Sequence, residues 1–278
     1  MDVRPDCLPC ILKQLLRTAR GATENEWLHR RVMKAALDDL RDADEAGSPA
    51  ELLSAALRSA LRTLGEPDPF ASARADLSRR LGPVVEELRA RIGEAERPLC
   101  AAALAAAAAN VVDELALRDF DPGEVILTLF ETGFGLADQG RFEREIEGAS
   151  RILFLHDNAG EAAIDQLLIS ELRSLDKDVD VVVRGAGLFH DATRDDVPPT
   201  GLIIETESEV MGAPPVLCST LFNEALERAD LVIAKGSASW QTLPPSLPLV
   251  TLLTPKCEVM AAALGIKSGR PAMVFADG

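Results

Sequence analysis

The segment LFLHDNAGEAAID, residues 153–165, decides the fold of this chain. Its apolar start is typical of a buried strand, and this run leads directly into His156, Asp157 and Asn158. Two small residues follow, and then a helical pattern begins, so the segment predicts a strand that passes into a helix. Open α/β sheets bind ligands at the carboxyl ends of their strands. Three polar side chains at this position therefore predict a functional site.

The same alternation of short apolar runs and helical patterns continues from residue 150 to the end of the chain. Helical patterns separate apolar runs at 151–155, 180–183, 201–205, 230–236, 247–253 and 271–275. Strands that are apolar throughout and separated by helices predict a mostly parallel sheet with helices on both faces. We therefore expect an α/β domain at 149–278.

Residues 1–148 show a helical pattern almost throughout. Apolar residues recur at helical spacing in the segments 7–20, 25–40, 50–64 and 83–92. The alanine-rich stretch 99–112 predicts a slim helix that packs closely against its neighbours. It is shorter than the roughly 20 apolar residues that a membrane helix needs. We predict an all-helical domain at 1–148, joined to the α/β domain.

The composition limits the partners of this chain. Its 278 residues include 29 basic and 45 acidic side chains, a net charge of −16. An acidic surface repels phosphate backbones, so we expect no nucleic-acid partner. An anionic substrate would need a bound cation or a few well-placed lysines. The first residues lack a signal-peptide pattern, which predicts a cytoplasmic protein with no membrane partner. The sequence leaves open whether it forms a homo-oligomer.

Two of the five cysteines, Cys7 and Cys10, form a CxxC motif. A structural zinc site usually has four ligands, and no second CxxC or HxxxH follows. The helical pattern of the next residues places both thiols near the start of a helix. A structural role and a metal or redox role are both open, and the first fits this pattern better.

Side chains with related chemistry follow several of the predicted strands. Asp157 and Asn158 follow the strand at 151–155, and Asp191 comes after the strand at 180–183. Carboxylate and amide oxygens are the ligands that hard divalent cations prefer. Lys235 and Lys256 end two later strands and could hold an anion against that cation. The helix that begins near residue 160 would add backbone N–H groups. This set suits phosphoryl transfer or phosphate-ester hydrolysis.

Each of these features has a simpler explanation when taken alone. A DN pair before glycine is usually a turn or a helix cap, and a lysine–glycine pair at a strand end is commonly a turn. Asp191 could be a solvated loop acid, and His156 and His190 could be core histidines. Only their convergence on one sheet edge favours a site.

The order of these motifs resembles the metal-dependent damage-control phosphatases, the DUF89 family, and in particular its small prokaryotic branch. The resemblance covers nearly the whole chain. The motifs that carry it are CLPC (7–10), DPF (68–70), AAAANVVDE (106–114), DNAGE (157–161), VVVRGAGLFHDATRDD (181–196), ADLVIAKG (229–236) and TPKCEVMAAALGIKSG (254–269). The resemblance implies a helical domain packed on a Rossmann-like sheet, and hydrolysis of small phosphate esters such as sugar phosphates or damaged metabolites.

By this resemblance Asp157, Asn158 and Asp191 would hold a divalent metal: Mg²⁺, Mn²⁺, Co²⁺ or Ni²⁺. Lys235 and Lys256 would contact the phosphate of a small-molecule ester.

The same motifs make Glu161, Gly236 and Ser237 candidates for substrate or phosphate binding. Asn110 and Asp113 lie three apart on one helical face. They could support the site or contact substrate, or they could belong to a polar network that joins the helical domain to the sheet.

In the mechanism that we expect, the metal binds a phosphate oxygen and water attacks in line. Asp191, Glu161 and His156 are all candidates for the group that orients this water.

The chain departs from the family pattern at two places. His190 stands where the family usually has asparagine. After Lys235 and Gly236 the family continues with glutamine, asparagine and glutamate, where this chain has Ser237, Ser239 and Gln241. Two alternatives to a phosphatase stay open, the first because of this altered segment and the second because the sheet pattern alone permits it. One is a non-catalytic protein that binds a metal or metabolite. The other is a nucleotide-cofactor enzyme such as a methyltransferase, although no GxGxxG follows the first strand.

Overall fold

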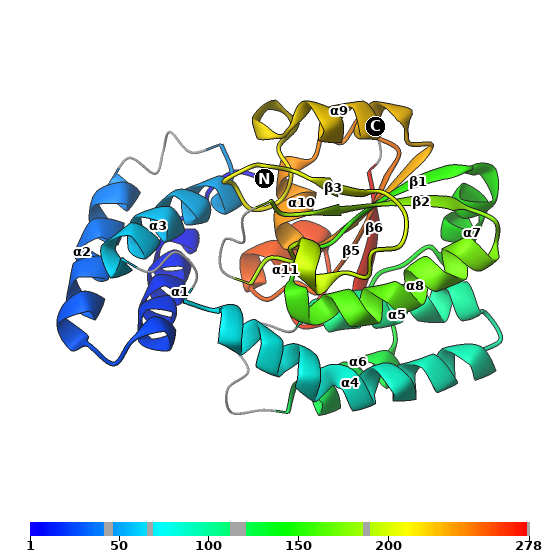
Figure 1. Ribbon diagram of the computed structural model, residues 1–278, viewed down its shortest axis with the longest axis horizontal. Coiled ribbons are helices and arrows are strands. Elements are labelled where there is room, and N and C mark those ends of the chain that lie inside the picture. The colour runs from blue at the N-terminus through cyan, green and yellow to red at the C-terminus, as the bar shows by residue number, and fades with distance from the viewer. Residues whose placement is uncertain (42–46, 66–68, 112–120, 186–189, 277–278) are drawn as a thin grey trace.

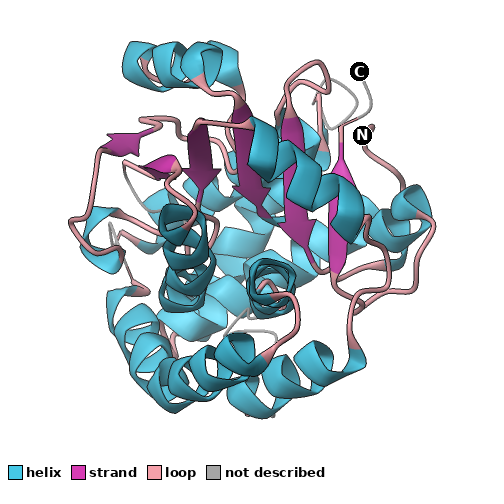
Figure 2. Cartoon of the chain, turned by 90° about the vertical axis from the view of Figure 1, so that its right-hand side faces the viewer, coloured by secondary structure: helices cyan, strands magenta, loops and turns pink. Residues whose placement is uncertain are grey.

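The computed structural model describes residues 1–41, 47–65, 69–111, 121–185 and 190–276. In this part of the chain six strands form one sheet in the order β3-β2-β1-β4-β5-β6 (Figures 1 and 2). The strands are β1 (Arg151–Leu155), β2 (Asp178–Val183), β3 (Ile203–Glu205), β4 (Leu231–Lys235), β5 (Leu249–Leu253) and β6 (Ala272–Phe275). Each overlaps one predicted apolar run. All neighbours pair in parallel except β5 and β6, which confirms the mostly parallel sheet.

Strand β1 lies at the centre of the sheet, where the chain changes direction. Ile152 pairs with Val179 of β2 on one side and with Leu231 of β4 on the other. The chain runs outward from β1 through β2 to β3, and then returns to continue outward through β4 and β5. This is the strand order in which ligands bind between β1 and β4, outside the carboxyl ends of the strands.

Helices cover both faces of the sheet, as the apolar strands predict. Ile152 and Phe154 of β1 belong to a core shared with helices α4, α5 and α8. Leu153 and Leu155 point to the opposite face and pack in a core with residues of α9. The helices are α1 (Cys7–Ala22), α2 (Glu26–Arg41), α3 (Pro49–Leu64), α4 (Ala71–Glu94), α5 (Pro98–Ala109), α6 (Pro122–Thr132), α7 (Gln139–Gly148), α8 (Ala162–Ser174), α9 (Thr220–Arg228), α10 (Gly236–Thr242) and α11 (Glu258–Leu264).

The alanine-rich helix α5 is buried on nearly all sides. Seven of its alanines, Ala102, Ala103 and Ala105–Ala109, have no exposed surface. Because alanine side chains are small, α8 and β5 can both pack directly against this helix. The predicted close packing is confirmed. Within the described residues, no helix combines the length and the apolar character that crossing a membrane requires.

Helix α4 is longer than the pattern at 83–92 predicts. It spans Ala71–Glu94, with Pro83 inside it. Proline in a helix interior costs about 3 kcal/mol, because it removes a hydrogen bond and crowds the preceding turn. The apolar stripe extends across it, however, from Leu77 and Leu81 to Leu88 in one buried core. We attribute the continuous helix to the burial of this stripe.

Helices α1–α3 form a core of their own, beside the carboxyl edge of the sheet (Figure 1). Three hydrogen bonds attach α3 to the sheet half. Ala50 N–H donates to Gln241 Oε1 (3.0 Å), Met211 N–H donates to Ser54 Oγ (2.8 Å), and Arg58 donates to the carbonyl of Glu209. Helices α4–α7 instead share contacts and core with the sheet layer. The division into domains at residue 148 stays a prediction.

Candidate active site

The site lies where β1 and β4 end side by side. His156, Asp157 and Asn158 follow β1, while Lys235 is the last residue of β4 and Gly236 begins α10. The two strands are hydrogen-bonded neighbours, so these polar residues meet at one point of the sheet edge. This is the position between β1 and β4 at which such sheets bind ligands.

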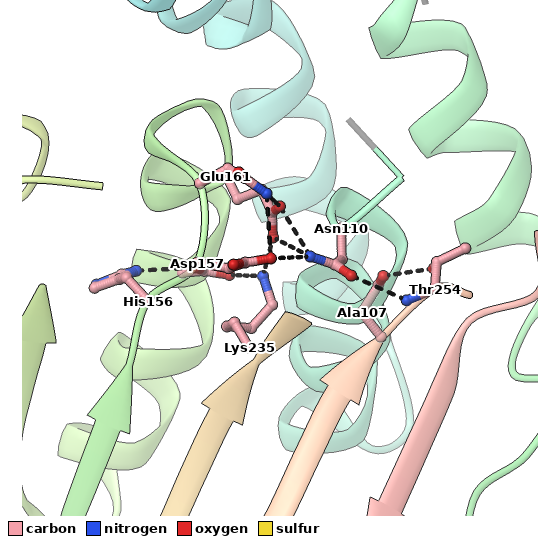
Figure 3. A network of polar contacts seen from close by, with 9 residues as sticks. Ala107, Asn110, His156, Asp157, Glu161, Lys235 and Thr254 are labelled. Carbon is pink, nitrogen blue, oxygen red and sulfur yellow. Dashed lines mark hydrogen bonds and ion pairs between the residues drawn. The ribbon is translucent and has the colours of Figure 1, made fainter. Parts of the chain in front are cut away.

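Asp157 is the centre of a network of amides and carboxylates (Figure 3). Its Oδ2 accepts a hydrogen bond from Asn110 Nδ2 at 2.8 Å and from Asn158 Nδ2 at 3.2 Å. Asn158 Nδ2 also donates to Glu161 Oε1 at 2.6 Å. Carboxylates only accept, so the amide of Asn158 must present its nitrogen to them. Its Oδ1 therefore faces away from these acceptors and is the atom of Asn158 that could bind a cation.

Asn110 ties the helical half of the chain to this network. Its Nδ2 donates to Glu161 as well as to Asp157, and its Oδ1 accepts from the Thr254 N–H at 3.2 Å. The Thr254 hydroxyl in turn donates to the carbonyl of Ala107 at 2.8 Å, which fastens the end of α5 to the end of β5 (Figure 3). Asn110 is 1% exposed and does not line the cavity described below. A contact between Asn110 and substrate stays a prediction, and Asp113 lies outside the described residues.

Lys235 is completely buried and belongs to the same network (Figure 3). Its Nζ lies 2.6 Å from both Glu161 Oε2 and Asp165 Oδ1. Burial alone would lower the pKa of Lys235, but these two carboxylates outweigh burial and raise it above its ordinary value. The lysine is therefore charged and neutralises part of the buried acid cluster. It is not among the residues that line the cavity, so its contact with phosphate stays a prediction.

His156 is fixed in the same buried cluster. Its Nδ1 lies 2.9 Å from Asp165 Oδ2, and both side chains are fully buried. Burial would raise the pKa of Asp165, but Lys235 and His156 outweigh it and lower the pKa. Asp165 thus connects the histidine after β1 to the lysine at the end of β4.

The loop after β2 brings Asp191 beside Asn158. An isolated antiparallel bridge joins the two residues, and the Ala192 N–H donates to the carbonyl of Asp157 at 2.8 Å. Asp191 Oδ2 lies 3.1 Å from Arg184 Nε, and both side chains are buried. The predicted ligands Asp157, Asn158 and Asp191 therefore come from two adjacent loops that are held together by backbone hydrogen bonds.

Arg184 is a site residue that the sequence analysis did not identify. Its guanidinium pairs with Asp191 and also donates to the carbonyls of Val210 and Gly212, each at 2.5 Å. The signal was an arginine directly after the buried strand β2. A charged side chain at such a place needs a partner, but the sequence does not say which one.

The electrostatics of Asp157 fit a bound cation. Burial, then Glu161 and also Asp191 raise its pKa to about 7, while Lys256 and Asn110 act in the opposite direction. Negative charge is thus concentrated at the place where Asp157 and Asn158 face the cavity. The described residues contain no group of three His, Cys, Asp or Glu side chains arranged to hold a metal. The available donors are instead two carboxylates and one amide oxygen, which suits a hard cation that keeps several waters.

A cavity of about 580 Å³ opens above these residues. Asp157, Asn158, His190, Ser237 and Lys256 border it from the sheet side. Its other walls come from α1, α3, α11 and Met211, so the N-terminal helices complete the site. Lys256 is exposed and Ser237 is half-buried, so both can reach a ligand in the cavity. These two predicted phosphate contacts are placed where a substrate could meet them.

The CxxC motif also lies at this cavity. Helix α1 begins at Cys7, and both Cys7 and Cys10 line the wall, together with Cys257 before α11. All three are free thiols. Burial, followed by Cys257 and Cys7, raises the pKa of Cys10, which favours the unreactive thiol form. All three thiols border the cavity, and the structural role of Cys7 and Cys10 stays a prediction.

The backbone N–H groups expected at the start of the helix after β1 are largely used within the protein. A short 3-10 turn, Ala159–Glu161, precedes α8. The Ala159 N–H donates to the carbonyl of His190 at 2.8 Å, and the Glu161 N–H donates to the carbonyl of Asn158. These two N–H groups hold the two ligand loops in place and are not available to a phosphate, and a contribution from the other N–H groups of this terminus stays a prediction.

Gly236 is required at its position for two reasons. Its φ of +82° is strained for other residues, and a Cβ atom would lie 1.9 Å from Asp157 Oδ2. We expect Gly236→Ala to destabilise the protein by about 3–4 kcal/mol, from the left-handed backbone and from the clash. Urea unfolding measures this loss.

Gly65→Ala is the matched control for that substitution. Gly65 has a similar φ of +77°, but a Cβ there would have nothing within 4 Å. Only the backbone cost, about 1–2 kcal/mol, is expected. Equal losses in the two variants would show that the approach of Asp157 to Gly236 is unimportant.

The chain matches the family model described as "Damage-control phosphatase ARMT1-like domain" over residues 3–271. Two relatives carry the name damage-control phosphatase. The one from Pyrococcus horikoshii is 27% identical, with 97% of this chain and 96% of the relative covered. The one from Archaeoglobus fulgidus is 28% identical, with 97% of both covered. A protein of Methanocaldococcus jannaschii is 28% identical over 97% of this chain and 94% of its own length.

The fold has a close counterpart among solved structures. The crystal structure of a DUF89 family protein from Pyrococcus horikoshii superimposes with a TM-score of 0.85 over the full length of both chains, at 26% identity. The α/β fold of this chain is therefore shared with that structure.

Proposed function

We propose a specific activity for this chain, which belongs to the damage-control phosphatase family with an ARMT1-like domain. The proposal is that it hydrolyses small phosphate monoesters with the help of a divalent metal, and the names of two relatives support the phosphatase class. One observation carries the proposal. Asp157, Asn158 and Asp191 meet from two adjacent loops, and the first two border a cavity that also contains an exposed lysine. The donor set supports a metal.

Asp157, Asn158 and Asp191 would hold the cation, with water filling the remaining positions. Magnesium, manganese, cobalt and nickel all accept such a set. When bound, the cation supplies charge neutralisation on the phosphate and lowers the pKa of coordinated water. Glu161 keeps the amide of Asn158 in the orientation that leaves Oδ1 available.

The remaining residues position the substrate. The exposed ammonium of Lys256 attracts the phosphate dianion into an otherwise acidic protein, and the Ser237 hydroxyl can donate to a phosphate oxygen. Asp191, Glu161 and His156, the candidates for orienting the attacking water, do not line the cavity. His190 does, with its ring 5.5 Å from that of Phe70, so its imidazole joins the candidates.

The proposal predicts metal-dependent turnover that depends on Asp191. We expect Asp191→Asn to lower kcat/KM for an aryl phosphate by about 10²–10³-fold, because it removes one of two ligand carboxylates. Steady-state assays with and without each metal measure this.

Asp195→Asn is the matched control, since Asp195 is an exposed acid in the same loop. It should stay within about twofold of the parent. A protein that binds metal but hydrolyses no phosphate ester would instead be a binding protein of the same fold. Equal activity of the two variants would exclude Asp191 from the site.

A further inference from the structure

The cavity has two chemically different parts. Polar side chains gather at the sheet edge, where Asp157, Asn158 and Lys256 lie. The walls away from that edge are mainly aliphatic or contain sulfur, and they include Ile11, Leu53, Met211, Val259 and Met260. The wall residues come from α1, α3 and α11 and from the segment between β3 and α9, so four separate parts of the chain present apolar groups to one space.

Several polar atoms on these walls already have partners within the protein. Gln241 Oε1 accepts from the Ala50 N–H at 3.0 Å, Cys7 Sγ accepts from the Arg4 N–H, and Cys257 Sγ accepts from the Met260 N–H. The acidic residues at the border, Asp6 and Glu258, are exposed to solvent. Gln14 of α1 also borders the cavity. A sugar packed against the aliphatic walls would bury hydroxyl groups against Ile11, Leu53 and Val259, which offer no hydrogen-bonding atoms, at a cost of about 1–3 kcal/mol for each hydroxyl left without a partner.

The size of the cavity leaves room for a substantial organic group. Its volume of about 580 Å³ lies within the range of small-molecule sites, roughly 300–1,000 Å³. A phosphate and its metal would occupy only the polar end. The rest of the space would enclose whatever is esterified to the phosphate.

We propose that the substrates are phosphate monoesters of largely apolar alcohols, with an aryl or medium-length alkyl group rather than a polyhydroxylated sugar. The inference rests on the proposed function and narrows its substrate class. The phosphate binds at the polar end, and the carbon chain packs between α1, α3 and α11. Leu53 determines specificity by contacting this chain.

Binding of non-hydrolysable phosphonates tests the inference separately from turnover. Calorimetry in the presence of Mg²⁺ would compare hexylphosphonate, methylphosphonate and the phosphonate analogue of glucose 6-phosphate. We expect hexylphosphonate to bind at least about tenfold more tightly than either of the others, because its methylene groups leave water. Equal affinity for the hexyl and methyl compounds, or a preference for the sugar analogue, would overturn the inference.

A pair of variants on α3 locates the effect. Leu53→Asn should weaken hexylphosphonate binding about fivefold and leave methylphosphonate within about twofold. Leu61→Asn is the control, because Leu61 also packs at the edge of the α1–α3 core but does not line the cavity. It should leave both affinities unchanged. Equal effects of the two variants would remove Leu53 from the substrate site.

Turnover assays distinguish the two ways in which these ideas can fail. Metal-dependent hydrolysis of sugar phosphates in preference to hexyl phosphate would overturn the inference and leave the proposed function intact. Tight, selective binding of hexylphosphonate without hydrolysis of any ester would support the apolar site and contradict the phosphatase. If none of the three phosphonates binds, the inference is wrong.

Discussion

Asp157→Asn is expected to abolish metal-dependent turnover while making the metal-free protein more stable. Activity should fall by about 10³-fold or more, because the substitution removes a ligand carboxylate at the cavity floor. Stability should rise because the ionised carboxylate is disfavoured in the folded protein by burial, by Glu161 and by Asp191. Asparagine keeps an oxygen that Asn110 can donate to, so the network is largely preserved. Thermal melting of the metal-free protein should show a higher melting temperature, and kinetic assays of the same variant with metal should show the loss of activity.

The pH dependence of this gain has a definite sign. The pKa of Asp157 is about 7 in the folded protein against 3.8 ordinarily, so the folded protein binds the proton more tightly. The ionised carboxylate of Asp157 therefore lowers the free energy of unfolding by its full amount above about pH 7. This effect disappears as the pH falls towards about 4. With a chelator at about pH 8 we expect Asp157→Asn to gain roughly 2 kcal/mol, after allowing for screening by cavity water. The gain should vanish near pH 4.

Asp165→Asn is the contrasting variant. Its carboxylate is stabilised by Lys235 and His156, which hold its pKa below the ordinary value. The same substitution should therefore lower the free energy of unfolding at neutral pH, by roughly 3 kcal/mol. A loss of stability in both variants would contradict the proposed charge crowding at Asp157.

Lys235→Met is expected to be the most destabilising of the lysine substitutions. It would leave Glu161 and Asp165 buried without their shared cation, each now missing a contact of 2.6 Å. Removing one partner of a buried ion pair typically costs about 3–5 kcal/mol. Urea unfolding measures the loss, and a smaller loss at lower pH would identify the unpaired carboxylates as its cause.

Lys256→Met separates structural from substrate-binding lysines. Lys256 is exposed at the cavity, so we expect less than about 0.5 kcal/mol change in stability and a clear rise in KM for phosphate esters. Lys235→Met should instead lower the free energy of unfolding strongly. If Lys235→Met folds as stably as the parent, Lys235 is not the cation that neutralises the buried acids.

The sequence by itself determined the strands and the place of the site. Six mainly apolar runs separated by helical patterns are six strands in the structure, because apolar side chains on both faces of a strand are stabilised where helices cover both faces of the sheet. Asp157 and Asn158 come two and three residues after the end of the central strand, and chain connectivity alone places them at the carboxyl edge of the sheet.

Only the tertiary structure decided what the charged side chains do. Lys235 ends β4 and Lys256 follows β5, yet Lys235 is buried between two acids and Lys256 is exposed at the cavity. The partner of Arg184 and the apolar cavity walls likewise depend on segments far apart in the chain. The local sequence pattern predicts which residues are buried in strands and where each strand ends. The direction of a long side chain and its partners depend on the packing of several elements, which no single segment contains.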